Sequence, residues 1–174
     1  MKQKQQAYQA FVDLVYQHQG ILQRVCSVYT FSPEDRDDLY QEILMQSWRS
    51  FASFNGQSKF STWLYRVALN TALVRRRKAA ARREVACEAG ANVDVAVDDR
   101  GDRDPDVDLL YRCIQELPTL NRAIVLLYLE QHTYEEIAEI TGLSRGNVSV
   151  RLVRIKDKLR QLLLARGYRE GQQS

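Results

Sequence analysis

"TYEEIAEITGLSRGNVSVRLVRIKDKL", residues 133–159, holds the start, the turn and the second helix of a helix-turn-helix. Thr133 followed by Glu136 is a capping-box pattern, in which each side chain satisfies a backbone amide at the helix start. Gly142 permits a left-handed turn, and Ser144 can cap the helix that follows. Apolar residues then recur at helical spacing and predict an inward face, formed by Val148, Leu152, Ile155 and Leu159. The stretch therefore predicts two short helices joined by a tight turn.

The outer side of the second helix is strongly basic. Residues 145–160 contain six cations and one acid, and Asn147 and Ser149 add hydrogen-bonding groups near the N-terminal end. That end of a recognition helix is the part that enters the major groove of DNA. A solvated helical corner and a protein-docking surface carry similar charge, but we favour a contact with duplex DNA.

"SKFSTWLYRVALNTALVRRRK", residues 58–78, combines an apolar stripe with four consecutive cations. As a helix, it buries one side and exposes the other. The predicted inward residues are Phe60, Leu64, Val67, Ala68, Thr71 and Val74. The predicted outward residues are Lys59, Thr62, Trp63, Arg66, Asn70 and Arg77. An aromatic ring beside cations suits single-stranded nucleic acid, because bases stack on the ring and phosphates follow the charge. A core position for Trp63 and an ordinary solvated helix end for the cations remain as alternatives.

Helical spacing continues along most of the chain, and glycine and proline are scarce, so we predict an all-α protein. The second helix has a strong start signal, because Ser32 can cap it and Pro33 suits the first helical position. We expect the remaining elements in this order: a helix over residues 5–29 that Gly20 can interrupt, a helix over 33–51, a turn over 53–59, and helices that start near Val107 and at Pro118.

Charge divides the chain into three parts. Residues 1–83 carry 13 basic and 6 acidic side chains, residues 84–117 carry 3 and 10, and residues 118–174 carry 9 and 6. The two basic ends favour a polyanionic partner. Residues 84–106 combine weak periodicity with dense aspartate, which is typical of a linker. We therefore predict two small helical domains, residues 1–83 and 107–174, joined by a flexible acidic linker over residues 84–106.

Several classes of protein are disfavoured by composition. No run reaches the roughly 18 apolar residues that span a bilayer, and the start lacks the apolar run of a signal peptide, so we expect no membrane span and a cytoplasmic location. Cys26, Cys87 and Cys113 are far apart and have no metal-ligand spacing, so we expect buried or idle thiols and neither metal nor cofactor. His18 and His132 fall in separate predicted domains, and no serine, tyrosine or carboxylate cluster has the spacing of a nucleophile or metal site. We therefore expect that the protein is not an enzyme.

The order of these parts resembles a bacterial RNA polymerase sigma factor of the extracytoplasmic-function (ECF) type. The resemblance rests on "DDLYQEILMQSW" at residues 37–48, "FNGQSKFSTWLYRVALN" at 54–70, the acidic linker, and the segment that runs from Leu117 to Leu159. It covers about residues 5–165 and corresponds to conserved regions 2 and 4 of the sigma-70 family, without regions 1.1 and 3. It implies a protein that binds core RNA polymerase, directs it to specific promoters and assists DNA melting.

The resemblance also implies three sets of contact residues. Binding of the polymerase β′ clamp is implied for Asp38, Gln41 and Glu42, and the β flap is expected as a second contact on the core enzyme. Contact with the melted minus-ten element is implied for Asn55, Gln57, Ser58, Lys59, Thr62, Trp63, Arg66 and Asn70, and the basic run adds Arg75, Arg76 and Arg77. Contact with the duplex minus-thirty-five element is implied for Arg145, Asn147, Ser149, Val150, Arg151, Val153 and Arg154. An anti-sigma factor is expected as a further partner.

The chain departs from the family pattern where primary sigma factors carry a tryptophan pair that wedges the duplex open. Arg66 and Val67 stand there, which implies melting by base capture and a strict promoter preference. A solvated acidic face remains the alternative for Asp38 and its neighbours. The alternative function is a stand-alone helix-turn-helix regulator, which explains the C-terminal segment but leaves the basic helix and the acidic linker without a role.

Overall fold

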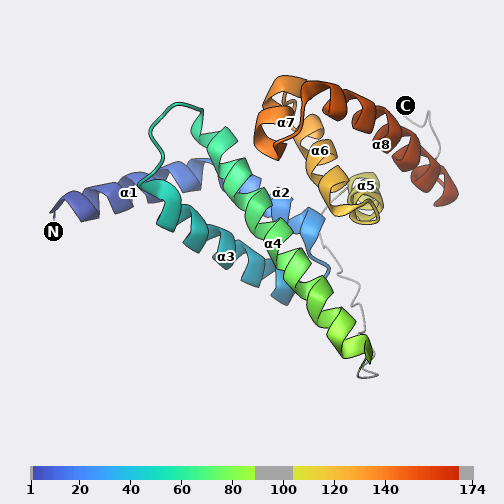
Figure 1. Cartoon of the computed structure of the whole chain (residues 1–174), viewed down its shortest axis with the longest axis horizontal. Helices are drawn as coiled ribbons and strands as arrows, with labels where there is room; N and C mark the ends of the chain where they lie inside the picture. The colour runs from blue at the N-terminus through green and yellow to red at the C-terminus, as the bar shows by residue number, and fades with distance from the viewer. Residues whose placement is uncertain (1, 89–103, 169–174) are drawn as a thin grey trace. The chain divides into compact units, whose positions relative to one another are not determined.

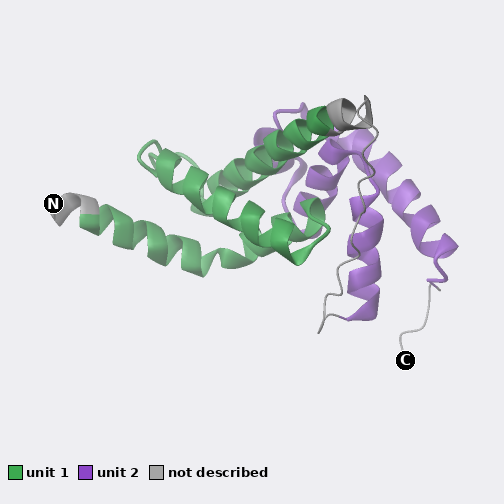
Figure 2. Ribbon diagram, turned by 90° about the horizontal axis from the view of Figure 1, so that it is seen from below, with its two compact units in different colours: residues 1–97 green, residues 98–174 purple. Residues whose placement is uncertain are grey.

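A computed structural model describes residues 2–88 and 104–168, with side chains for residues 5–82 and 104–168. Within these ranges every regular element is an α-helix, from α1 to α8 in chain order (Figure 1), which confirms the all-α prediction. The chain divides into two compact units, residues 1–97 and residues 98–174 (Figure 2), called unit 1 and unit 2 below.

Unit 1 is built around three helices that pack against one another and a fourth that reaches them through aromatic contacts. Its described helices are α1 (Lys2–Gln17), α2 (Gln19–Tyr29), α3 (Pro33–Phe51) and α4 (Phe60–Glu88). α2, α3 and α4 pack pairwise, and α1 joins α3 where the ring of Phe11 lies 5.2 Å from that of Trp48. The fully buried side chains between α2, α3 and α4 include Leu22, Leu39, Ile43 and Leu64. Removing these apolar side chains from water is the main source of stability for the unit.

The first predicted helix is two helices, and the break lies at His18 instead of Gly20. The backbone N–H of His18 donates to the carbonyl of Val15 at 3.0 Å, which is the tighter bonding of a 3₁₀ turn. The His18 ring hydrogen-bonds the carbonyl of Leu14 at 2.9 Å and packs 5.3 Å from the ring of Phe60. A tertiary contact therefore accompanies the break, whereas Gly20 lies in the first turn of α2.

The predicted start of α3 is confirmed, but the predicted limits of the linker are not. Ser32 accepts a hydrogen bond from the backbone N–H of Asp35 at 3.1 Å, and proline occupies the first helical turn. α4 continues past the predicted end of helical order to Glu88, and α5 (Pro105–Gln115) starts directly after its cap, Asp104. Residues 84–88 and 105–106 are thus helical, and the rest of the predicted linker, residues 89–103, lies outside the described residues.

Unit 2 contains the predicted helix-turn-helix. Its described helices are α5, α6 (Thr119–Leu129), α7 (Tyr134–Thr141) and α8 (Arg145–Ala165), and α8 packs against the other three. The capping box of Thr133 and Glu136 is formed, Gly142 has φ 74°, and Ser144 accepts from the backbone of Asn147 at 3.3 Å. The predicted inward face is confirmed, because the following residues are all buried: Val148, Leu152, Ile155 and Leu159.

Two of the three cysteines have described side chains. Cys26 and Cys113 are buried free thiols, as predicted. Burial raises the pKa of Cys26 to about 12, so this thiol stays protonated at neutral pH. Among the described helices there is none whose length and apolar content would let it cross a membrane.

Candidate nucleic-acid interface

The turn between α3 and α4 presents polar side chains to solvent. Asn55, Gln57 and Lys59 are exposed, and Ser58 is half-buried. The Oδ1 atom of Asn55 accepts from the backbone N–H of Gln57 at 3.2 Å, and Gly56 has φ 74°, so the turn has a defined local geometry. The four loop residues predicted to contact the minus-ten element therefore lie together on one turn.

Trp63 packs against both ends of this loop. Its ring lies 5.3 Å from Phe54, 5.3 Å from Phe60 and 6.2 Å from Phe51. Such ring contacts contribute about 0.5–1.5 kcal/mol each beyond area burial. Trp63 remains half-buried, so part of its ring supports the loop and the rest is exposed to solvent.

A strip of polar residues follows Trp63 along the outer side of α4. Arg66, Asn70 and Arg77 lie on the same side as Trp63, because their spacing matches the helical repeat. Asn70 and Arg77 are exposed, and Arg66 is half-buried. A groove of about 500 Å³ lies between α3 and α4, and its lining includes Asn70, Arg49 and Lys78. Asn70 is the predicted outward residue that lines this groove, whose charged side chains are those of Arg49, Lys78 and Glu42.

Two residues of α4 face the opposite way from the prediction. Thr62 is 4% exposed, whereas Val74 is 44% exposed. α4 packs against both α2 and α3, so it buries two stripes, and the second contains Tyr65 and Leu69 at 2% and 3% exposure. Thr62 belongs to this second stripe, so the prediction that it lies on the outward side of the helix is wrong. Val74 lies with the outward residues, so the prediction that it belongs to the core is also wrong.

Arg75 forms an intramolecular ion-pair network with α3. Its guanidinium lies 2.9 Å from Asp35, 3.4 Å from Glu42 and 3.8 Å from Asp38, and its side chain is 30% exposed. The sequence predicts a DNA contact for Arg75 and polymerase contacts for Asp38 and Glu42. It does not predict the network, because the hydrogen-bonded partners are 33 and 40 positions apart in the chain.

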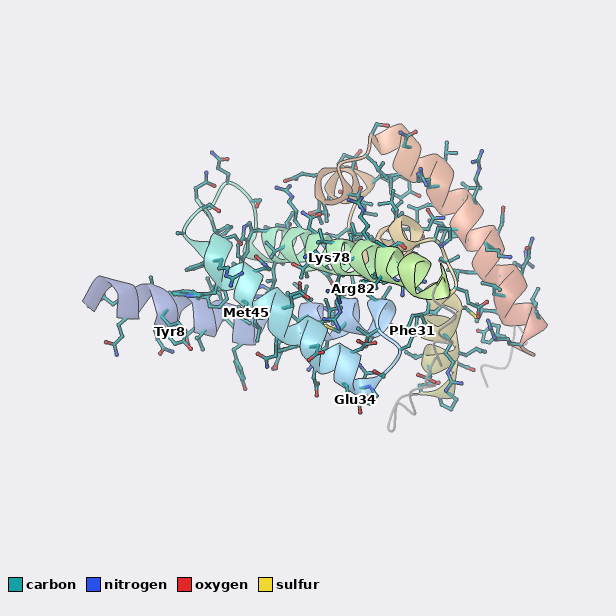
Figure 3. The ribbon with its side chains drawn as sticks, turned by 60° about the horizontal axis from the view of Figure 1, so that its bottom comes forward. Tyr8, Phe31, Glu34, Met45, Lys78 and Arg82 are labelled. Atoms are coloured by element: carbon teal, nitrogen blue, oxygen red, sulfur yellow. The ribbon has the colours of Figure 1, made fainter. Side chains whose placement is uncertain are left out.

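The other cations of the basic run do not all lie on one side of α4. The guanidinium of Arg76 lies 5.6 Å from the centre of the Phe31 ring, which is a cation–π distance. Arg77 and Lys78 are exposed, and Figure 3 shows Lys78 and Arg82 along the later turns of α4 with Phe31 nearby. Each residue turns the helix by about 100°, so consecutive cations cannot share one face. Arg75, Arg76, Lys78 and Arg82 line one groove, whereas Arg77 is not part of its lining, so the predicted phosphate track is split between two sides of the helix.

The three residues of α3 with a predicted polymerase contact share one side of that helix. Asp38, Gln41 and Glu42 are spaced three and four residues apart, which places them on neighbouring helical positions. Gln41 is exposed, and the side chains of Asp38 and Glu42 are 74% and 32% exposed. Asp38 is thus the most accessible carboxylate of the Arg75 network.

Contacts from α6 and α7 hold α8 in place. Arg145 pairs with Glu135 of α7, and Arg151 donates to the side-chain oxygen of Asn121 of α6 at 3.3 Å. A backbone N–H and then Arg145 hold the pKa of Glu135 below its usual value. Lys156 donates to the hydroxyl of Tyr128 of α6 at 2.9 Å, and this bond raises the pKa of Lys156.

The side of α8 that faces solvent carries most of the predicted duplex contacts. The exposed residues of this set are Arg145, Asn147, Val150, Arg151, Val153 and Arg154, and Ser149 is half-buried. Arg154 and Lys158 form no hydrogen bond or ion pair with the described residues, so their charges are directed to solvent. The structure thus brings the predicted minus-thirty-five residues onto one exposed helix.

Both units of the chain match known family models. Residues 14–82 match the family model "Sigma-70 region 2", and residues 108–159 match "Sigma-70, region 4". The ECF RNA polymerase sigma-E factor of Haemophilus influenzae is 33% identical over 162 residues, which cover 86% of this chain and 85% of that protein. The chain belongs to the ECF sigma factors. It is therefore a sigma factor that directs RNA polymerase to promoters, and the stand-alone regulator is not favoured.

A second ECF sigma factor and two solved structures are also similar to this chain. SigM of Mycobacterium tuberculosis is 29% identical over 156 residues, which cover 88% of this sigma factor and 77% of SigM. The fold resembles RpoE of Bartonella quintana, solved in complex with the anti-sigma factor NepR, with a TM-score of 0.70, 23% identity, and coverage of 90% and 95% of the two chains. It also resembles CnrH, solved with the cytosolic domain of CnrY, with a TM-score of 0.64, 26% identity, and coverage of 91% and 90%.

Proposed function

We propose that this sigma factor divides promoter recognition between its two units. Unit 1 binds core RNA polymerase and the melted minus-ten strand, and unit 2 binds the duplex minus-thirty-five element. The single observation that carries the proposal is that each unit exposes its own helix side of cations and hydrogen-bonding groups, α4 in unit 1 and α8 in unit 2. Separate surfaces suit DNA that is single-stranded in one element and duplex in the other.

The acidic side of α3 is the proposed contact for the β′ clamp of the polymerase. Exposed carboxylates form strong charge-assisted hydrogen bonds with arginines of a partner, and an amide such as that of Gln41 adds a neutral hydrogen bond. The exposure of Asp38 and Gln41 supports this assignment. Arg75 has a positioning role, because it holds Glu42 while it leaves Asp38 largely in solvent. The β flap is the proposed contact of unit 2 on the core enzyme.

The loop before α4 and the outer side of α4 form the proposed minus-ten surface. The turn offers the hydrogen-bonding groups of Asn55, Gln57 and Lys59, and the ring of Trp63 packs against Phe54 of the same turn. A flipped base would stack on the exposed part of Trp63, while Asn70, Arg66 and Arg77 would bind the following phosphates. Base–aromatic stacking contributes about 1–3 kcal/mol per base.

The solvent side of α8 is the proposed minus-thirty-five surface. Asn147 and Ser149 lie near its N-terminal end, where a recognition helix meets base edges. Arg154 has no partner among residues 104–168, which leaves its guanidinium available to a base or a phosphate. A good bidentate contact with guanine contributes about 1–3 kcal/mol of discrimination against other bases.

We also propose an anti-sigma factor as a regulatory partner, a cytoplasmic location and no catalytic activity of its own. The similar fold of RpoE, which was solved with an anti-sigma factor, supports the first of these. Co-purification from cells that express a tagged chain tests the proposed partner, because an inhibitory protein should remain bound until core polymerase displaces it.

The decisive experiment mixes the purified protein with core RNA polymerase and a library of genomic promoter fragments. We expect new transcripts only when both proteins are present, with start sites downstream of shared sequence elements. Asp38→Asn combined with Gln41→Ala should weaken core binding with unchanged affinity of the assembled holoenzyme for promoter DNA. A protein that binds duplex DNA alone and adds no initiation would contradict the proposal.

A further inference from the structure

Two exposed valines stand in the middle of the solvent side of α8. Val150 and Val153 are 54% and 60% exposed, and their spacing of three residues makes them neighbours on the helix surface. The core of unit 2 does not use them, because the buried stripe of α8 lies on the opposite side of the helix, at Val148, Leu152, Ile155 and Leu159. The valines form an apolar centre on a helix side that is otherwise polar and charged.

Their neighbours indicate what kind of surface they meet. Asn147 and Arg154 lie beside the two valines on the helix surface, and Arg154 and Lys158 have no partner among residues 104–168. Protein interfaces are enriched in arginine but depleted of lysine, so Lys158 is the charge that disfavours a protein partner. The major groove of DNA instead combines a negative border with one apolar group on its floor, the C5-methyl group of thymine. Duplex DNA can therefore bind the cations through its phosphates and the two valines through thymine methyl groups.

We propose that Val150 and Val153 contact the C5-methyl groups of thymines in the upstream promoter element and so determine part of its sequence. The proposal rests on the assignment of α8 to duplex DNA made above. Valine suits this role because its branched side chain is stiff in a helix and loses little freedom on contact. Burying one methyl group changes affinity by about fourfold. Contact with the methyl group would therefore favour thymine over cytosine at these positions, where hydrogen bonds distinguish the two bases less.

Uracil substitution tests this proposal, because uracil differs from thymine only by the missing methyl group. Holoenzyme is assembled from core polymerase and the full chain. The promoter is one from which this holoenzyme initiates transcription. Each thymine of the upstream element is replaced by uracil in a synthetic duplex, and the affinity of the holoenzyme is measured. We expect about a fourfold loss at the thymines that face α8. The double variant Val150→Ala with Val153→Ala should bind thymine and uracil duplexes equally.

Matched controls separate this result from general weakening. Val107 is a 43% exposed valine on α5, and Val107→Ala should retain the full sensitivity to uracil. An upstream element without thymine, a wild-type holoenzyme indifferent to uracil, or a double variant that keeps the wild-type sensitivity would each overturn the proposal. Weaker binding of the double variant to core enzyme without DNA would also overturn it, since the valines would then face a protein. Failure of the holoenzyme to initiate at all would instead contradict the proposed function.

Discussion

Replacing Arg75 by alanine should destabilise unit 1 more than replacing Arg77, its exposed neighbour on the same helix. Arg75 lies 2.9, 3.4 and 3.8 Å from three carboxylates of α3, and its side chain is 30% exposed. Partly exposed ion pairs contribute about 0.2–1 kcal/mol each, so the network contributes about 1–2 kcal/mol. For a domain of this size, that loss lowers the unfolding midpoint by roughly 4–16 °C.

Tryptophan fluorescence measures this effect in unit 1 alone, because both tryptophans of the chain, Trp48 and Trp63, lie there. Arg77→Ala should change the free energy of unfolding by less than about 0.5 kcal/mol. In about 1 M salt the difference between the two variants should shrink, because the screening length falls to about 3 Å. Equal midpoints for the two variants at low salt would refute the network. A difference that salt leaves unchanged would refute its ionic origin.

Three further predictions concern other contacts. Trp63→Ala should lower the stability of unit 1 by about 2–3 kcal/mol and abolish promoter opening, as measured by thermal unfolding and transcription. Trp63→Phe should retain most of the stability and most of the promoter opening. An alanine variant as stable as the wild type would contradict the packing role. Arg154→Ala should reduce the slope of holoenzyme–promoter affinity against salt by roughly 0.9 in a logarithmic plot if it binds one phosphate; an unchanged affinity and slope would rule out a DNA contact. Glu135→Gln should lower the unfolding midpoint of unit 2 at neutral pH but leave it unchanged far below pH 4.5, the ordinary pKa of the group. The pKa of Glu135 is lowered in the folded state, so the ionised carboxylate stabilises the fold above its ordinary pKa, and this contribution is lost as the pH falls. A difference in midpoint that persists in acid would refute the ionic contribution.

Local features of the fold were predictable because their signals lie within a few residues of the chain. Ser32 caps the next helix through its own side chain, and Gly142 adopts the left-handed turn that its lack of a Cβ atom permits. The inward stripe of α8 was predictable for the same reason, since it faces one continuous core. The opposite side of α8 faces solvent and is the candidate surface for duplex DNA.

Features that depend on tertiary contacts were not predictable. A single buried stripe was inferred for α4, but the helix packs on two neighbours, which buries Thr62 and exposes Val74. The break at His18 accompanies a ring contact with Phe60, far along the chain. Arg75 looked like part of a phosphate track because its carboxylate partners belong to another helix. In each case the deciding interaction joins residues that sequence spacing does not relate.

Permanganate footprinting of promoter DNA tests the central claim most directly, because the reagent oxidises thymines in unpaired strands. With core polymerase and this sigma factor together, thymines of the minus-ten element should become reactive. Neither protein alone should produce this signal, and variants of Asn55 and Asn70 should reduce it while holoenzyme assembly is unchanged. A duplex that stays unreactive with both proteins bound would contradict the account.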